Sequence, residues 1–380
     1  MVRALSLLAG ASVAAAIVGC AASPGGGRLP ETVTVPDGTR FAVETVIEGL
    51  DTVWDLIRAP DGSIWFSERA GRVSRLEPAS GSRTLVGEVP GVLESGEAGL
   101  MGIALHPDFP AVPILYAAHS YDTGGGIGNR LVRMRYENGS LGPPEILLDG
   151  LAGRRNHDGS RIVFGPAGLL YMTMGDAGNR PASQDARSLS GKILRLTADG
   201  GPAPGNPFGD RIWSLGHRNP QGLFFHPEGM LYSTEHGAGD EDELNLIEPG
   251  GNYGWPALEG FCNTRGEEPW CAANDAVEPL WVWSPTVGIA GADLYAGDAV
   301  AGWEGDILAV SLRGASLYRV RLSADGRRAV SGETLLAGAF GRLRDVLVGP
   351  GGEIYLATSN RDGRGRPSRG DDRILRLTPR

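Results

Sequence analysis

The stretch Pro60-Asp61-Gly62-Ser63-Ile64-Trp65-Phe66 contains the pattern that decides the fold of this chain. Pro, Asp and Gly favour a tight turn, and the apolar residues that follow, with an aromatic among them, favour a buried strand. The same order of turn and strand returns five times. The further units are Pro107-Asp108-Phe109 with Ile114-Leu115-Tyr116, Pro166-Ala167-Gly168 with Leu170-Tyr171-Met172, Pro227-Glu228-Gly229 with Leu231-Tyr232, Trp303-Glu304-Gly305 with Ile307-Leu308-Ala309, and Pro350-Gly351-Gly352 with Ile354-Tyr355-Leu356.

A second pattern follows several of these units: strands in which apolar residues alternate with Arg, as in Arg72-Val73-Ser74-Arg75-Leu76 and Ile374-Leu375-Arg376-Leu377. Alternation with a period of two indicates strands with one face in solvent. No long stretch after residue 20 has the apolar period of a helix, which argues against an α/β fold. A two-sheet sandwich usually has fewer strands. Six units of this kind predict an all-β chain folded as a six-bladed β-propeller, in which the last strand could pair with the first.

Composition limits the class of partner. The 380 residues include 59 Gly and 26 Pro, which is typical of many turns between short strands. The formal net charge is -10. Nucleic acid is therefore not expected as a partner, because phosphate binding needs a basic face.

The N-terminus reads as an export signal. Residues 1–19 are expected to form a lipoprotein signal peptide, with Arg3 before an apolar core, and the sequence before Cys20 resembles a bacterial lipobox. Cleavage before Cys20 and lipidation of that residue would anchor the chain in the cell envelope facing the periplasm, with membrane contact through the lipid only. Ala21 lacks the Asp typical of inner-membrane retention, which favours the outer membrane. An ordinary signal peptide is the alternative.

The domain plan follows from this reading. Residues 20–38 are expected to form a flexible tether and residues 39–380 the propeller. If Cys20 carries lipid, Cys262 and Cys271 remain as a pair in one loop, and an exported chain permits a disulfide between them. A zinc site is the weaker alternative, since two Cys without a nearby His make a poor ligand set.

Polar loops between the strands are the candidate functional segments, because propeller loops carry function. In Arg155-Asn156-His157-Asp158-Gly159, His157 is a candidate general base that a nearby carboxylate could orient. In Gly216-His217-Arg218-Asn219-Pro220-Gln221-Gly222, polar side chains sit between two apolar strands. Both loops could instead be structural turns. The same applies to Gly175-Asp176-Ala177-Gly178-Asn179, where Asx and Gly favour a turn by default.

Three further loops carry charge or aromatic residues. The acidic run from Glu235 to Asn245 favours a bound cation such as Ca²⁺, although its spacing does not match an EF-hand and a solvated acidic loop is the alternative. The cluster Asn252 to Pro256 could be a packed corner. Arg342 and Arg344 alternate along a strand, so they share one face, which favours an anionic ligand or a salt-bridged structural face.

Taken together, these loops resemble those of the soluble quinoprotein sugar dehydrogenases, the family of aldose sugar and glucose/sorbosone dehydrogenases. The resemblance extends from about Val53 to Leu377. The motifs that carry it are Gly99-Leu100-Met101-Gly102, His106-Pro107-Asp108-Phe109, Asn156-His157-Asp158-Gly159, Gly191-Lys192-Ile193-Leu194-Arg195, Gly216 to Gly222, Glu235-His236-Gly237, Asp242-Glu243-Leu244-Asn245 and Asn252 to Pro256.

The resemblance implies a six-bladed propeller that binds pyrroloquinoline quinone (PQQ) and Ca²⁺ and oxidises the C1 hydroxyl of aldoses to a lactone. His157 would be the general base, Asp158 would orient it, and Arg218 would serve both catalysis and cofactor binding. Calcium would be held by the carbonyls of Gly237 and Ala238, and a second calcium by Glu243 and the Tyr253 carbonyl. The resemblance also implies a cofactor site that comprises Glu97, Arg218, Asn219, Arg313, Arg342 and Arg344.

Three positions depart from the family pattern. Glu97 stands where the family often has Gln, which places a negative charge near an anionic cofactor. Arg313 replaces a common Lys and keeps the charge, and Ala238 replaces a common Pro.

Two other functions remain open at this level. A calcium-dependent lactonase uses the same kind of fold but would need metal-ligating side chains in the channel and no arginine cluster. A non-catalytic propeller that binds carbohydrate cannot be separated by fold analogy. The sequence does not identify the preferred sugar or the external electron acceptor, and leaves a monomer or a homodimer open.

Overall fold

A computed structural model describes residues 29–380 of the chain. The predicted signal peptide (1–19), the lipidation site Cys20 and the first part of the expected tether lie outside the described residues. Within the described part, no helix is long and apolar enough to cross a membrane.

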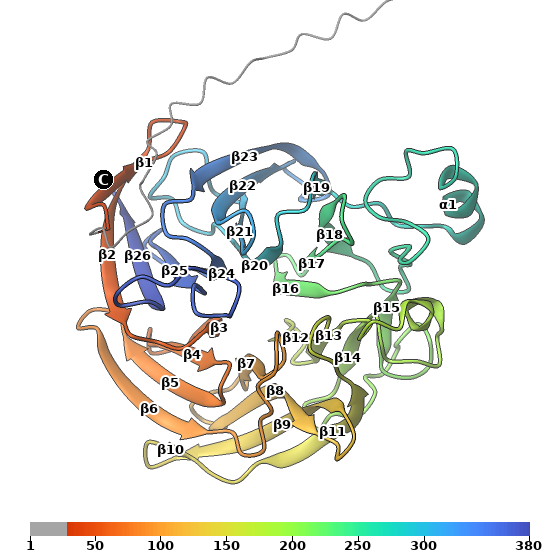
Figure 1. Ribbon diagram of the computed structural model, residues 1–380, viewed down its shortest axis with the longest axis horizontal. Coiled ribbons are helices and arrows are strands. Elements are labelled where there is room, and N and C mark those ends of the chain that lie inside the picture. The colour runs from red at the N-terminus through yellow and green to blue at the C-terminus, as the bar shows by residue number, and fades with distance from the viewer. Residues whose placement is uncertain (1–28) are drawn as a thin grey trace, which may run out of the picture.

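The described chain forms six antiparallel sheets arranged radially around a central axis (Figure 1). The first sheet contains β3 (Val53–Arg58), β4 (Ile64–Glu68), β5 (Arg72–Glu77) and β6 (Ser82–Glu88). The second contains β7 (Leu100–Leu105), β8 (Ile114–Asp122), β9 (Ile127–Glu137), β10 (Ser140–Leu141) and β11 (Glu145–Ala152). The third contains β12 (Gly159–Phe164), β13 (Leu170–Met174), β14 (Lys192–Leu196) and β15 (Ile212–Leu215). The fourth sheet contains β16 (Pro220–Phe225), β17 (Leu231–Glu235), β18 (Asp242–Ile247) and β19 (Trp281–Trp283). The fifth contains β20 (Ile289–Leu294), β21 (Ile307–Ser311), β22 (Ser316–Leu322) and β23 (Ala329–Ala337). The sixth contains β24 (Leu343–Val348), β25 (Ile354–Thr358) and β26 (Arg373–Pro379) together with β2 (Arg40–Glu48) and β1 (Thr32–Thr34) from the start of the described chain.

The predicted six-bladed propeller is confirmed, and the sequence patterns map onto fixed places in each blade. The six turn-plus-strand units supply the second strand of every blade, namely β4, β8, β13, β17, β21 and β25. The strands that alternate apolar residues with Arg are the third strands β5, β9, β14, β22 and β26. The second strands are buried almost throughout because both of their faces pack against neighbouring blades.

The ring is closed by strands from both ends of the chain. β26 pairs with β2 from Phe41 opposite Pro379 to Glu48 opposite Arg373, as expected for the last strand. The tether boundary at residue 38 is wrong, because β1 pairs with β2 and Val35 is buried in the core. Thr32-Val33-Thr34 is a β-branched run that forms an edge strand although it is only three residues long.

Inner strands of neighbouring blades are joined by buried carboxylates. Asp55 in β3 accepts a hydrogen bond from the backbone N–H of Ile103 in β7 (2.8 Å), and Asp345 in β24 accepts one from Leu56 in β3 (2.7 Å). Arg161 in β12 is buried and pairs with both carboxylates, at 3.0 Å from Asp345. This axial cluster of Arg161, Asp55 and Asp345 therefore connects three inner strands on different sides of the ring.

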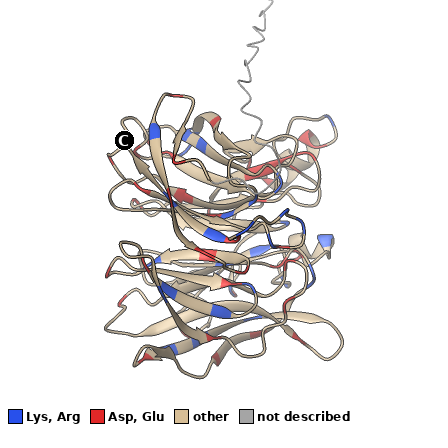
Figure 2. Ribbon diagram, turned by 60° about the vertical axis from the view of Figure 1, so that its left-hand side comes forward, with Lys and Arg blue, Asp and Glu red and all other residues tan. Residues whose placement is uncertain are grey.

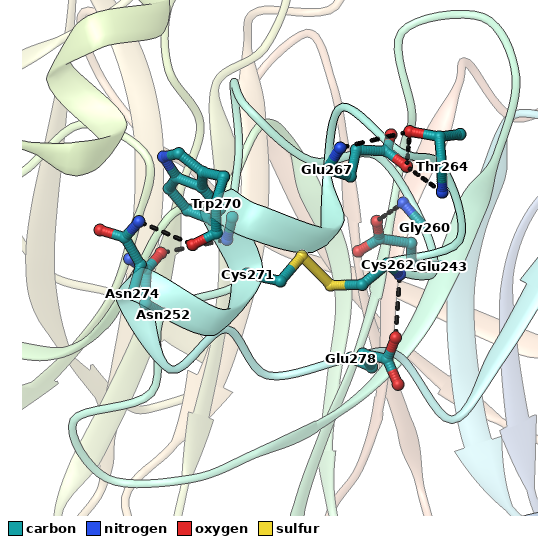
Figure 3. Close-up of a disulfide and its surroundings, with 11 residues drawn as sticks. Glu243, Asn252, Gly260, Cys262, Thr264, Glu267, Trp270, Cys271, Asn274 and Glu278 are labelled. Carbon is teal, nitrogen blue, oxygen red and sulfur yellow. Dashed lines mark hydrogen bonds between the residues drawn. A yellow bond between two sulfur atoms is a disulfide. The ribbon is translucent and has the colours of Figure 1, made fainter.

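Helix α1 (Glu268–Asn274) lies in the loop between β18 and β19 and projects from the outer edge of the ring (Figure 1). The predicted disulfide between Cys262 and Cys271 joins this helix to the preceding loop, with the two Cα atoms 6.4 Å apart (Figure 3). Figure 2 shows acidic and basic residues interspersed over the blades.

Candidate active site

The loops at one end of the propeller axis bring His157, Arg218, His236, Arg313 and Arg342 around one cavity of about 350 Å³. We call it the histidine cavity. These residues come from five different loops, three that connect blades and two within blades, which the radial arrangement of the inner strands brings together. The sequence predicted four of these five residues as site residues.

His157 is held by a hydrogen bond from a neighbouring loop. It lies just before β12 with a φ of 63°, and its Nδ1 is 2.8 Å from Oδ1 of Asp176. The other oxygen of Asp176 accepts a hydrogen bond from the indole of Trp255 (2.9 Å). Burial of Asp176 opposes its ionisation, but the hydrogen bonds from His157 and Gly178 outweigh burial and hold the pKa of Asp176 below its usual range. A carboxylate that favours its charged form thus fixes the ring of His157 with Nδ1 as the donor.

The prediction that Asp158 orients His157 is wrong, because the imidazole of His157 is hydrogen-bonded to Asp176 instead. The carboxylate of Asp158 accepts hydrogen bonds from Asn129 (2.9 Å) and from the backbone N–H of Arg154 (2.8 Å), so it closes the loop that carries His157. Burial raises the pKa of Asp158 to about 6. Adjacent residues on a sharp turn point apart, which is why the carboxylate next to the histidine in sequence is not its partner.

The loop with Arg218 and Asn219 is fixed by hydrogen bonds to the side chain of Glu235. This buried carboxylate accepts hydrogen bonds from the backbone N–H groups of both residues, at 3.1 Å for Asn219, and from Nδ1 of His217 (2.8 Å). Arg218 is further held by the carbonyl of His236 (3.1 Å) and lies over the ring of Trp255. Its Nε is buried and has no partner within the described residues.

Arg342 and Arg344 do not share a cavity. Arg342 precedes β24, lines the histidine cavity and pairs with Asp362 (2.6 Å). Arg344 is buried, donates a hydrogen bond to Gln221 (2.8 Å) and lines a second cavity. Burial without a paired carboxylate lowers the pKa of Arg344 to about 10, and among the described residues its Nε finds no partner. A buried cation of this kind is unfavourable unless an anion pairs with it.

The negative charge of Glu97 is balanced by an ion pair with Arg364. Glu97 lines both cavities and pairs with Arg364 from the last loop of the propeller (2.7 Å). Burial alone would raise the pKa of Glu97, but nearby cations including Arg364 outweigh it and keep the pKa below its usual range. The added negative charge that sequence analysis noted therefore has its own counter-ion. Arg313 is exposed at the rim of the histidine cavity.

The predicted calcium ligands lie in two places. Gly237 lines the histidine cavity next to exposed Ala238. Glu243 is buried farther from the cavity, and its carboxylate accepts hydrogen bonds from Asn245 (2.9 Å) and the backbone of Gly260 (2.7 Å; Figure 3). Within residues 29–380, no group of three or more His, Cys, Asp or Glu side chains is placed to hold a metal.

Sequence analysis missed Asp176, Trp255 and Arg364 as parts of the site. The sequence places Asp176 in a loop that could be a structural turn and Trp255 in a cluster that could be a packed corner, and it does not single out Arg364. The only signal in the sequence was that each lies in a polar loop following a buried strand, and this does not reveal which loops meet.

The fold and the site define a class of enzyme-like propellers in which an oriented histidine faces a cavity rich in arginine. Within this class, the chain belongs to the glucose/sorbosone dehydrogenase family, whose model matches residues 50–375. The chain is similar to quinoprotein glucose dehydrogenase B of Acinetobacter calcoaceticus, with 29% identity over 85% of this chain and 86% of that protein.

Solved structures agree with this assignment. The PQQ-bound aldose sugar dehydrogenase of Streptomyces coelicolor is 39% identical, with a TM-score of 0.79 and coverage of 90% of this chain and 98% of the other. The apo form of the soluble aldose sugar dehydrogenase of Escherichia coli is 27% identical, with a TM-score of 0.78 and coverage of 90% and 100%.

Proposed function

We propose that this protein is a PQQ-dependent sugar dehydrogenase that oxidises the C1 hydroxyl of aldoses to a lactone and passes the electrons to an external acceptor. The observation that carries the proposal is the His157–Asp176 pair at the wall of a cavity that is also lined by arginines. This combination supplies a proton acceptor and an anion-binding surface in one place.

The residues around the site fit a planar tricarboxylate. Arg218, Arg313 and Arg342 line the histidine cavity, and guanidinium groups match carboxylates in shape and charge. The buried Nε atoms of Arg218 and Arg344 have no acceptor among residues 29–380, which is expected where a ligand supplies the missing acceptors. We propose that these four arginines, with Asn219 and Glu97, form the PQQ site. When bound, PQQ supplies a quinone that accepts a hydride.

The role of His157 follows from its hydrogen bond. Because Asp176 accepts from Nδ1, the neutral imidazole keeps Nε2 as the site that receives a proton. His157 would take the proton of the C1 hydroxyl as the C1 hydride leaves, and Asp176 would stabilise the imidazolium that forms. Trp255 holds Asp176 in place, so the three side chains act as one unit.

Calcium is proposed at the two places that the resemblance indicates. The carbonyls of Gly237 and Ala238 would hold one ion beside the cofactor, where it would polarise the quinone oxygens. Glu243 and the carbonyl of Tyr253 would hold the second. The buried Oδ1 of Asn245 accepts no hydrogen bond from the described residues. This free oxygen supports a cation near Glu243, since oxygen atoms are the ligands that Ca²⁺ prefers.

Reconstitution tests the proposed function. Residues 21–380 would be produced without the anchor, loaded with PQQ and Ca²⁺, and assayed with a dye acceptor and a panel of aldoses. We expect saturable oxidation that requires both additions. If no quinone absorbance stays with the protein and no sugar is oxidised, the proposal fails, and lactone hydrolysis would be the next activity to test.

Arg344 provides a prediction in which binding and stability change in opposite directions. We expect Arg344→Ala to weaken PQQ binding at least about tenfold, because a charge-assisted contact is lost. The apo variant should be as stable as the wild type or more stable, because a buried unpaired cation is removed. Quinone titration and thermal unfolding measure the two effects.

The matched control for Arg344 is Arg135→Ala, which removes an exposed arginine paired with Glu137 far from the cavities. Unchanged quinone affinity together with lower stability in Arg344→Ala would show that Arg344 is purely structural.

Export remains part of the proposal. We infer that residues 1–19 are removed, that Cys20 carries lipid, and that the propeller faces the periplasm from the outer membrane. We expect Cys20→Ser to move the protein from the membrane fraction to the soluble envelope fraction while leaving its activity per molecule unchanged. Retention of the variant in the membrane fraction would contradict lipid anchoring through Cys20.

A further inference from the structure

A second cavity of about 460 Å³ adjoins the histidine cavity, and half of its ten lining residues are arginines. We call it the arginine cavity. Its arginines are Arg69, Arg155, Arg344, Arg361 and Arg364. Glu97, Asn156 and Arg364 line both cavities, so they form the wall that the two share.

The acidic residues near the arginine cavity are already paired. Glu97 pairs with Arg364 at 2.7 Å, and Asp362 pairs with Arg342 at 2.6 Å. Arg69, which lines the cavity, pairs at 2.9 Å with Glu94, which does not. Arg155, Arg344 and Arg361 are left without a carboxylate partner among residues 29–380. The cavity therefore has an excess of positive charge in a protein whose formal net charge is -10.

The two exposed arginines of this set, Arg155 and Arg361, are held in place by contacts within the protein, Arg155 through its backbone and Arg361 through its backbone and its Nε. The carbonyl of Arg155 accepts a hydrogen bond from the N–H of Glu97 (2.8 Å), and Gly96, with a φ of 70°, packs so closely on Arg155 that a Cβ would collide with it. The backbone N–H of Arg361 donates to Asp372 (3.3 Å), and its Nε donates to the carbonyl of Asp371. Both loops are thus fixed before any ligand binds, which reduces the entropy lost on binding.

The proposed quinone site has four arginines without these two. Arg218, Arg313 and Arg342 line the histidine cavity and Arg344 lines the adjoining one, which already exceeds the three carboxylates of the proposed cofactor. Arg155 lies two residues before His157 on the same loop, so a sugar whose C1 lies at His157 can extend past Asn156 toward it.

We propose that Arg155 and Arg361 bind an anionic substituent of the sugar, a carboxylate or a phosphate, so that the preferred substrates are uronic acids or sugar phosphates rather than neutral aldoses. This inference rests on the proposed function for the oxidation at C1 and adds the class of substrate. Arginine suits both groups because its planar fork donates two parallel hydrogen bonds.

The test compares D-glucose, D-glucuronate and D-glucose 6-phosphate as substrates of the enzyme loaded with PQQ and Ca²⁺. We expect kcat/KM for one or both anionic sugars to exceed that for glucose by about tenfold at low ionic strength, and the advantage to shrink with added salt because exposed charges are screened. In Arg155→Gln and Arg361→Gln, the ratio of anionic to neutral kcat/KM should fall about tenfold. Arg187→Gln, which removes an arginine that is 91% exposed and pairs with Asp185, should leave the ratio unchanged.

A binding measurement keeps this inference separate from the proposed function. Titration calorimetry with glucuronate and with glucose 6-phosphate should show saturable binding that Arg155→Gln and Arg361→Gln weaken, whether or not the protein turns over sugar. Oxidation of glucose with no preference for either anionic sugar would overturn the inference and leave the proposed function intact. Weaker PQQ binding in both variants with an unchanged substrate ratio would assign the arginines to the cofactor and also overturn it. If no sugar is oxidised but the anionic sugars bind through these arginines, only the proposed function fails.

Discussion

Replacing His157 by alanine should lower kcat for sugar oxidation about 10³-fold while PQQ affinity changes less than about threefold. A positioned general base contributes a factor of this size, because without it the proton must leave to water. The variant should fold normally, since the side chain of His157 lies at a cavity wall and its loop is closed by Asp158 rather than by the imidazole. Steady-state kinetics and quinone titration of the same preparation measure the two quantities.

Asp176→Asn separates chemistry from structure at this position. An amide cannot accept hydrogen bonds on both sides from His157, Gly178 and Trp255, and it cannot stabilise the imidazolium by charge. We expect kcat to fall about 10²-fold with little change in KM, a smaller loss than in His157→Ala because the imidazole itself remains. Asp185→Asn on the same loop, and His226→Ala in an exposed turn, are the controls and should retain full activity. Wild-type kcat in His157→Ala would remove His157 as the base.

Replacing Arg161 by leucine should destabilise the fold by about 3–5 kcal/mol, which is the effect of leaving a buried charge without its partner. Arg161 is the counter-ion of both Asp55 and Asp345, and all three side chains are buried on the propeller axis. Its guanidinium also lies over the ring of Trp54. Equilibrium unfolding in urea measures the loss. Arg135→Leu, which breaks an exposed pair, should change stability by less than about 0.5 kcal/mol.

The destabilisation by Arg161→Leu should depend on pH with a defined sign. Burial raises the pKa of Asp55 above its ordinary value to about 7 even with Arg161 present, so the folded state holds the proton more tightly than the unfolded state. Removal of the cation raises this pKa further. Stability from such a group is present at low pH and lost as pH rises through neutrality. The variant should therefore lie closer to the wild type at pH 5 than at pH 8, and a difference that does not vary with pH would contradict this account.

The six-fold repeat of turn and buried strand made the fold predictable, because each unit is local in sequence and its hydrogen bonds are formed with its neighbours. The same holds for the disulfide, whose cysteines are separated by nine positions. Loop residues were predictable as a set, since their polarity conflicts with the strands around them. Their partners were not. The contact between His157 and Asp176 spans 19 positions and closes the open end of the β12–β13 hairpin, so it depends on the register of that hairpin. The contact between Glu97 and Arg364 spans 267 positions and depends on closure of the ring rather than on any local pattern.

Closure of the ring by β2 and β26 has a consequence for how the chain reaches its native state. The ion pair between Glu44 and Arg376 joins residues 332 positions apart, and the strands that carry them complete the same sheet. Until residues 373–379 are available, β2 has an open edge and the inner strands of the first and last blades lack their lateral support. Contacts of such large sequence separation form late, because loop closure must precede them. Loss of the last eight residues should thus affect all blades at once, and a ring that cannot close will offer the edge of β2 to another chain.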